Sequence, residues 1–85
     1  MWEDSELAEL KWQTIPQSMR FFTTTNGAAV VVYMNRAKDA KTGRVLYGVV
    51  IQYPNRRLNF PLGDAMKLKV ALDDVYRFGR EKEGL

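Results

Sequence analysis

The sequence contains neither cysteine nor histidine, and both absences narrow its chemistry. Without cysteine, disulfides, zinc–thiolate sites and thiol nucleophiles are excluded, and so are the small disulfide-bonded scaffolds of secreted proteins. Without histidine, the chain lacks the commonest general base near neutral pH and the commonest metal ligand. It also has no Walker A motif, no GxGxxG and no zinc-ligand spacing. We therefore expect a protein that is not an enzyme and that uses no metal or cofactor.

Long apolar runs are missing too. The longest one extends from Ala28 to Met34, which is far too short to cross a bilayer. The first ten residues contain four acids and no base, whereas a signal peptide begins with positive charge. We therefore expect a soluble cytoplasmic protein that binds no membrane. Because 85 residues form one domain with a small core, we also expect a homodimer to supply further burial.

Positive charge is concentrated in the middle of the chain. Residues 11–62 carry eight bases and one acid, whereas residues 63–85 carry five of each sign. A basic segment of this kind is expected of a protein that binds a polyanion. It is equally expected where Lys and Arg simply keep strand ends and loops in solution. Charge alone leaves both interpretations open.

The middle of the chain has the β-branched, aromatic and alternating composition of strands. Four strands are expected, over residues 19–24, 28–36, 44–53 and 56–60. Asn26-Gly27 predicts a type I′ turn after the first strand, because that turn needs positive φ at both central residues. Residues 37–43 predict a polar loop, and Pro54-Asn55 predicts the centre of a tight turn. Such short connections indicate an antiparallel meander.

After Pro61, apolar residues recur at three- and four-residue intervals, which predicts one helix, capped by Asp64 and ended by Gly79. Residues 2–12 predict a short N-terminal helix that is marginal on its own. The expected fold class is therefore α+β, a four-stranded antiparallel β-meander followed by one C-terminal helix (ββββα). The expected divisions are an acidic arm over residues 1–17, a single domain over residues 18–79 and a frayed charged tail over residues 80–85.

The meander also predicts where basic and aromatic side chains gather. Its second loop lies at one end of the sheet and its third turn at the other, so two basic groups are expected. The group at the loop end comprises Arg20, Arg36, Lys38, Lys41 and Arg44, and the group at the third turn comprises Arg56 and Arg57. Phe21 and Phe22 must point to opposite faces, and bases stack on exposed rings, although strand aromatics are more often core or interface residues. The candidate nucleic-acid-binding residues are Arg20, Arg36, Lys38, Lys41, Arg44, Arg56, Arg57, Phe22 and Tyr47.

One stretch, from Arg44 to Phe78, resembles the core of the PC4-type transcriptional coactivators. The matching features are a loop ending in KTG, the strand VLYGVVIQY, and RLNFPL leading into DAMKLKVALDDV. That family has four strands followed by one helix, dimerises, and binds single-stranded DNA with basic and aromatic residues. The resemblance implies the same architecture and a similar ligand. Two features depart from the family: Met66 or Leu68 replaces the usual first-turn aromatic, and the leader is acidic.

Two functions are therefore expected. The first is a small non-catalytic single-stranded nucleic-acid-binding protein, DNA being favoured over RNA, that serves as a transcription or replication accessory factor. The second is a protein-binding adaptor or inhibitor of the phage or mobile-element type, since tryptophan is a frequent hot-spot residue of interfaces. Its candidate partner-binding residues are Trp2, Leu7, Leu10 and Trp12. The same acidic arm is also expected to cover the sheet structurally, or to lie on the basic surface and compete with nucleic acid.

Overall fold

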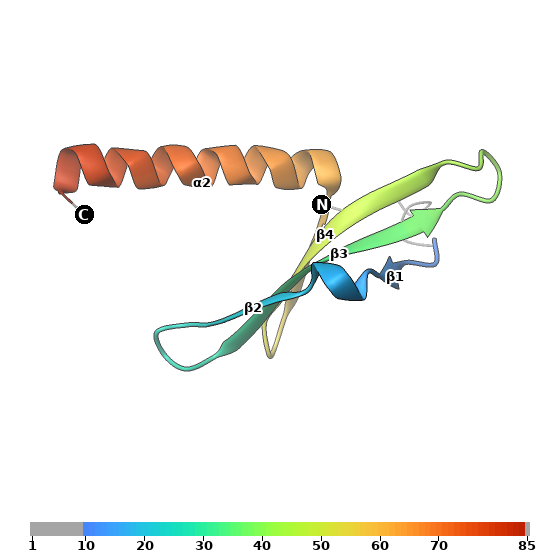
Figure 1. Ribbon diagram of the computed structural model, residues 1–85, viewed down its shortest axis with the longest axis horizontal. Coiled ribbons are helices and arrows are strands. Elements are labelled where there is room, and N and C mark those ends of the chain that lie inside the picture. The colour runs from blue at the N-terminus through green and yellow to red at the C-terminus, as the bar shows by residue number, and fades with distance from the viewer. Residues whose placement is uncertain (1–9, 85) are drawn as a thin grey trace.

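The structure is a computed structural model that describes residues 10–84 (Figure 1). Its elements are, in chain order, β1 (Gln13–Thr14), the 3-10 helix η1 (Pro16–Ser18), β2 (Arg20–Thr23), β3 (Ala29–Lys38), β4 (Val45–Gln52), β5 (Arg57–Pro61) and α2 (Leu62–Glu83). The predicted α+β class, an antiparallel sheet followed by one C-terminal helix, is confirmed. The N-terminal helix was predicted over residues 2–12. Residues 2–9 lie outside the described residues, and residues 10–12 are not helical.

Two short strands share one edge of β3. The sheet has the order β1–β3–β4–β5, and β2 pairs with β3 on the same edge as β1. η1 separates them, and Ser18 fixes its position on β3, because its hydroxyl group accepts a hydrogen bond from the Met34 N–H (2.7 Å) and donates one to the Ile15 carbonyl (2.6 Å). The sequence pattern did not predict β1, since two residues show no periodicity.

The two hairpin turns had different outcomes. The predicted type I′ turn is wrong: Gly27 has φ +89°, but Asn26 does not have positive φ. The Gly27 N–H instead donates to the Thr24 carbonyl (2.9 Å) and the Thr24 N–H to the Ala28 carbonyl (2.8 Å). This is a three-residue loop with glycine in the left-handed position. Pro54-Asn55 does occupy the centre of the turn between β4 and β5, where the Tyr53 N–H donates to the Arg56 carbonyl (2.9 Å).

One face of the sheet, which we call the helix face, carries the start of α2. The strand register gives it two apolar rows, Met34–Val49–Phe60 and Val32–Ile51–Leu58. Between these rows and the helix lies a hollow of about 270 Å³, lined by Val49, Ile51, Phe60, Ala65, Leu68, Lys69, Leu72 and Asp73. Within the described part of the chain few side chains are fully buried, Val30 and Val50 being the largest. The core is therefore small, as its length predicts.

Both predicted ends of the helix are wrong. α2 begins directly after Pro61 with no side-chain cap, so that Asp64 lies within the first turn. It passes through Gly79 and ends at Glu83, where Gly84 adopts the left-handed conformation (φ 69°). Residues 80–83 are therefore helical and not a frayed tail, since Arg, Glu and Lys are good helix formers. Among residues 10–84, no helix combines the length and apolar character needed to cross a bilayer.

Candidate nucleic-acid interface

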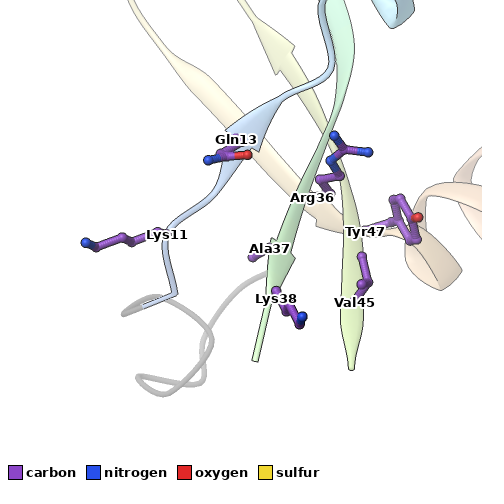
Figure 2. A pocket seen from close by; sticks show the side chains of 7 residues that line it. All are labelled: Lys11, Gln13, Arg36, Ala37, Lys38, Val45 and Tyr47. Carbon is purple, nitrogen blue, oxygen red and sulfur yellow. The ribbon is translucent and has the colours of Figure 1, made fainter. Parts of the chain in front are cut away.

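A hollow of about 400 Å³ lies where β3 leads into the β3–β4 loop (Figure 2). We call it the basic pocket, and its lining residues are Lys11, Gln13, Arg36, Ala37, Lys38, Val45 and Tyr47. Strand register brings them together: Arg36 of β3 lies opposite Gln13 of β1 on one side and opposite Tyr47 of β4 on the other. Lys38 and Val45 form the next row of the same face. Three strands thus build one site.

The electrostatics of the basic pocket are one-sided. Lys11, Arg36 and Lys38 are exposed, and none of the lining residues that the structure describes is acidic. None of these three cations forms an ion pair with any residue between 10 and 84. Cations that pair with no acid of residues 10–84 are available to phosphates, and each phosphate that they neutralise releases counterions from the nucleic acid.

Tyr47 adds an aromatic surface to these charges. Its side chain is 40% exposed and lies directly across the strand pair from Arg36. In Figure 2 the Tyr47 ring extends outward from β4 at the rim of the basic pocket. An exposed ring beside a cation can stack a base while the cation holds the adjoining phosphate.

The β3–β4 loop brings two more bases, Lys41 and Arg44, to this end of the sheet, and Asp39 organises it. The Asp39 carboxylate accepts hydrogen bonds from the Lys41 N–H (2.9 Å) and the Thr42 hydroxyl group (3.1 Å). These bonds, above all the one from Lys41, hold the pKa of Asp39 below its ordinary value of 3.8. The main chain closes the loop through the Asp39 N–H and the Arg44 carbonyl (2.8 Å).

The predicted basic residues fall into two groups at opposite ends of the sheet, with one exception. Arg36, Lys38, Lys41 and Arg44 lie at the loop end, and Arg56 and Arg57 lie at the β4–β5 turn. Arg20 is the exception: it lies opposite Val32, six residues or about 20 Å of strand from Lys38. Its guanidinium donates to the carbonyls of Gln17 (3.0 Å) and Met19 (2.9 Å).

The expected grouping of Arg20 with the loop bases is wrong because β1 occupies the part of the β3 edge that β2 was expected to fill. Phe22 lies still further from the loop, opposite Val30, and is 52% exposed. Lys11 and Gln13, and not Arg20, lie beside β3 in the basic pocket. The sequence marks Lys11 only as the first base after the acidic leader, and no pattern positions it.

The residues of the alternative, protein-binding hypothesis are described only in part. Trp2 and Leu7 lie outside the described residues, whereas Leu10 and Trp12 are half-buried. Comparison of the chain with known protein families, curated proteins and solved structures finds no match. The geometry of the sheet and its pocket is therefore the basis for a functional proposal.

Proposed function

We propose that the protein binds single-stranded nucleic acid without catalysing a reaction, and that the basic pocket and the β3–β4 loop hold its phosphates. The observation that carries this proposal is the basic pocket itself. Among residues 10–84, its lining has three cations without ion-pair partners, no acid, and one exposed tyrosine. This combination of charge and ring is typical of proteins that bind single strands.

The size of the basic pocket favours a single strand over a duplex. Its volume of about 400 Å³ lies in the range of small-ligand sites and suits one nucleotide. A base can reach Tyr47 only if it is unstacked, as it is in a single strand. The resemblance to the PC4-type family favours DNA over RNA and a cytoplasmic role as a transcription or replication accessory factor.

Fluorescence anisotropy with a labelled single-stranded oligonucleotide, titrated at several salt concentrations beside the matching duplex, tests this proposal. We expect saturable binding that prefers the single strand. Arg36→Ala/Lys38→Ala should weaken binding about tenfold and make the salt slope shallower by about 1.4, since two phosphate contacts are lost. Lys67→Ala/Lys82→Ala removes the same charge from exposed positions on α2 and is the matched control. An equal loss in both variants, or no binding by the wild type at low salt, would refute the proposal.

Tyr47 separates stacking from simple charge attraction. We expect Tyr47→Ala to lower affinity for single strands by about 1–3 kcal/mol, because one base loses its stacking partner. Tyr47→Phe keeps the ring and should bind like the wild type in the same anisotropy assay. If the two variants bind equally well, Tyr47 is no stacking platform.

A further inference from the structure

The hollow between α2 and the helix face, which we call the helix hollow, is left open by the side chains around it. It has a volume of about 270 Å³. Its apolar lining residues are Val49, Ile51, Phe60, Ala65, Leu68 and Leu72. All but Leu72 are half-buried, and Leu72, which is 61% exposed, leads the apolar stripe of α2 on to the exposed Val75 and Tyr76. Since packed interiors have few voids larger than a water molecule, a hollow of this size has the character of a ligand site.

The helix hollow lies beside the basic pocket on the same face of the sheet. Tyr47 lines the basic pocket, and Val49, two residues further along β4, lines the helix hollow. Residues two apart on a strand share a face and lie about 7 Å from each other. Figure 2 shows the Tyr47 ring on the opposite side of the basic pocket from Lys11. A single strand with unstacked bases spans more than the ~3.4 Å per nucleotide of a stacked duplex, so one nucleotide step can lead from Tyr47 to the helix hollow.

The walls of the helix hollow suit the flat faces of a nucleobase. Phe60 of β5 supplies a ring on the sheet side, and Leu68 of α2 lies in the opposite wall. Bases stack on aromatic rings whatever their identity, because every base has a π face. The volume is slightly below the roughly 300 Å³ at which drug-sized sites begin, so it suits one base better than a whole nucleotide. The apolar walls would therefore hold a base but would not choose among bases.

Two charged side chains, Lys69 and Asp73, complete the described lining of the helix hollow. They are one turn apart on α2, both are exposed, and neither forms an ion pair with any residue between 10 and 84. A lysine that precedes an acid by four residues is the less favourable order for a helical ion pair. Both groups therefore remain available to a ligand in the hollow.

This pair of groups matches the pairing edge of guanine. An aspartate carboxylate has only acceptors and can take two parallel N–H donors at once. Guanine alone among the four bases has two adjacent N–H donors, at N1 and N2, next to an acceptor, O6. Lysine is a usual donor to O6 and N7 of guanine. Each of the other bases presents at most one donor nitrogen to the carboxylate, so half of its capacity would remain unused.

We propose that the helix hollow holds a guanine base of the strand whose phosphates lie on the basic pocket. Asp73 accepts hydrogen bonds from guanine N1–H and N2–H, and Lys69 donates one to O6, while the ring stacks on Phe60. The proposal rests on the proposed function and adds a preference for one base, which phosphate contacts by themselves cannot give. The ligand is a base within a strand, because the cations continue from the basic pocket into the β3–β4 loop and give a strand more phosphate contacts than one free nucleotide can make.

Fluorescence anisotropy with three labelled strands tests the base preference. The strands are an oligothymidine, the same strand with one central guanine, and the same strand with inosine, which lacks the N2 amino group, in place of guanine. We expect the guanine strand to bind about tenfold more tightly than the oligothymidine, and the inosine strand to lose most of this gain. Asp73→Asn should abolish the preference for guanine without weakening binding of the oligothymidine. Asp74→Asn removes the same charge from the neighbouring residue, which pairs with Arg77 (3.9 Å), and this matched control should keep the preference.

The outcomes separate the guanine site from the proposed function on which it rests. Salt-dependent binding of all three strands with equal affinity would overturn the guanine site and leave the proposed function standing, whereas no binding of any strand at low salt would refute both. Equal loss of the preference in Asp73→Asn and Asp74→Asn would also overturn the guanine site. Unlabelled GTP should displace the guanine strand only in the millimolar range, because it gains fewer phosphate contacts than a strand. Displacement at micromolar GTP would assign the hollow to a free nucleotide and contradict the proposal.

Filling the helix hollow tests where the base lies. Ala65→Leu enlarges a side chain of its lining and should abolish the preference for guanine, while the oligothymidine binds as before. Ala71→Leu makes the same change at an exposed position of α2 outside the hollow and should keep the preference. Circular dichroism at 222 nm checks that both variants retain the helix. A folded Ala65→Leu variant with an undiminished preference would show that the base does not enter the hollow.

Discussion

The basic pocket and the outer half of α2, residues 69–83, are both exposed, but exposure has opposite energetic meaning in the two regions. Cations in the basic pocket are well solvated, so they can remain in water until a polyanion displaces that water. The apolar stripe of the outer half gains about 25 cal/mol for each Å² that leaves water. A partner is therefore optional for the pocket and strongly favoured for the stripe. We expect reversible, salt-sensitive binding at the first and lasting association at the second.

The largest effect should come from reversing the charge of the basic pocket. Arg36→Glu/Lys38→Glu changes two attractions to phosphate into two repulsions, and we expect affinity for a single-stranded oligonucleotide to fall at least ~100-fold. The sedimentation mass should not change, because both residues lie on β3 and outside the outer half of α2. Leu72→Glu, in the outer half of α2, should leave the affinity for a strand without guanine and the salt slope per chain at their wild-type values. If the pocket variant also dissociates, the two regions are not separate.

The elements that could be predicted from sequence are those whose own residues determine them. β3 and β4 were predicted to within two residues at each end, because a long run of β-branched residues strongly favours a strand. Pro54-Asn55 was predicted as a turn because proline fixes φ locally. The amphipathic stripe of α2 likewise appears in the spacing of its apolar residues.

The features that could not be predicted depend on neighbours distant in the chain. β1 exists because Ile15 and Ser18 bond to Met34, which no local pattern shows. The basic group at the loop end was therefore predicted with Arg20 in it and without Lys11. Gly79 was predicted to end the helix because glycine commonly follows the last helical residue. In the structure it lies inside α2, where it is buried.

The next effect in size concerns the stripe alone. If a second copy covers the outer half of α2, stability depends on protein concentration, because association favours the folded state by mass action. We expect a tenfold dilution to lower the Tm of the wild type by about 3–6 °C, measured by circular dichroism at 222 nm. Leu72→Glu should have a lower Tm that does not change on dilution. A wild-type Tm that is constant over a hundredfold range would show that the monomer is stable with its stripe bare.

The smallest effect concerns Asp39, the acid beside the basic pocket. Its pKa is lowered in the folded protein, so its hydrogen bonds contribute stability that is present above the unfolded pKa and is lost as pH falls through the folded value, below 3.8. A carbon-13 NMR titration should place its midpoint below 3.8. Thr42→Val should raise this midpoint only in part, because the Lys41 N–H, the largest cause, remains.

The same titration bears on the comparison between the two regions. Because Asp39 stays ionised above pH 5 and the chain has no histidine, neither the loop nor a histidine switch should alter the basic pocket between pH 5 and 8. Affinity for single strands should therefore be nearly flat across that range at constant ionic strength, in contrast to its steep dependence on salt. A sharp pH dependence there would mean that a group outside the basic pocket and its loop controls binding.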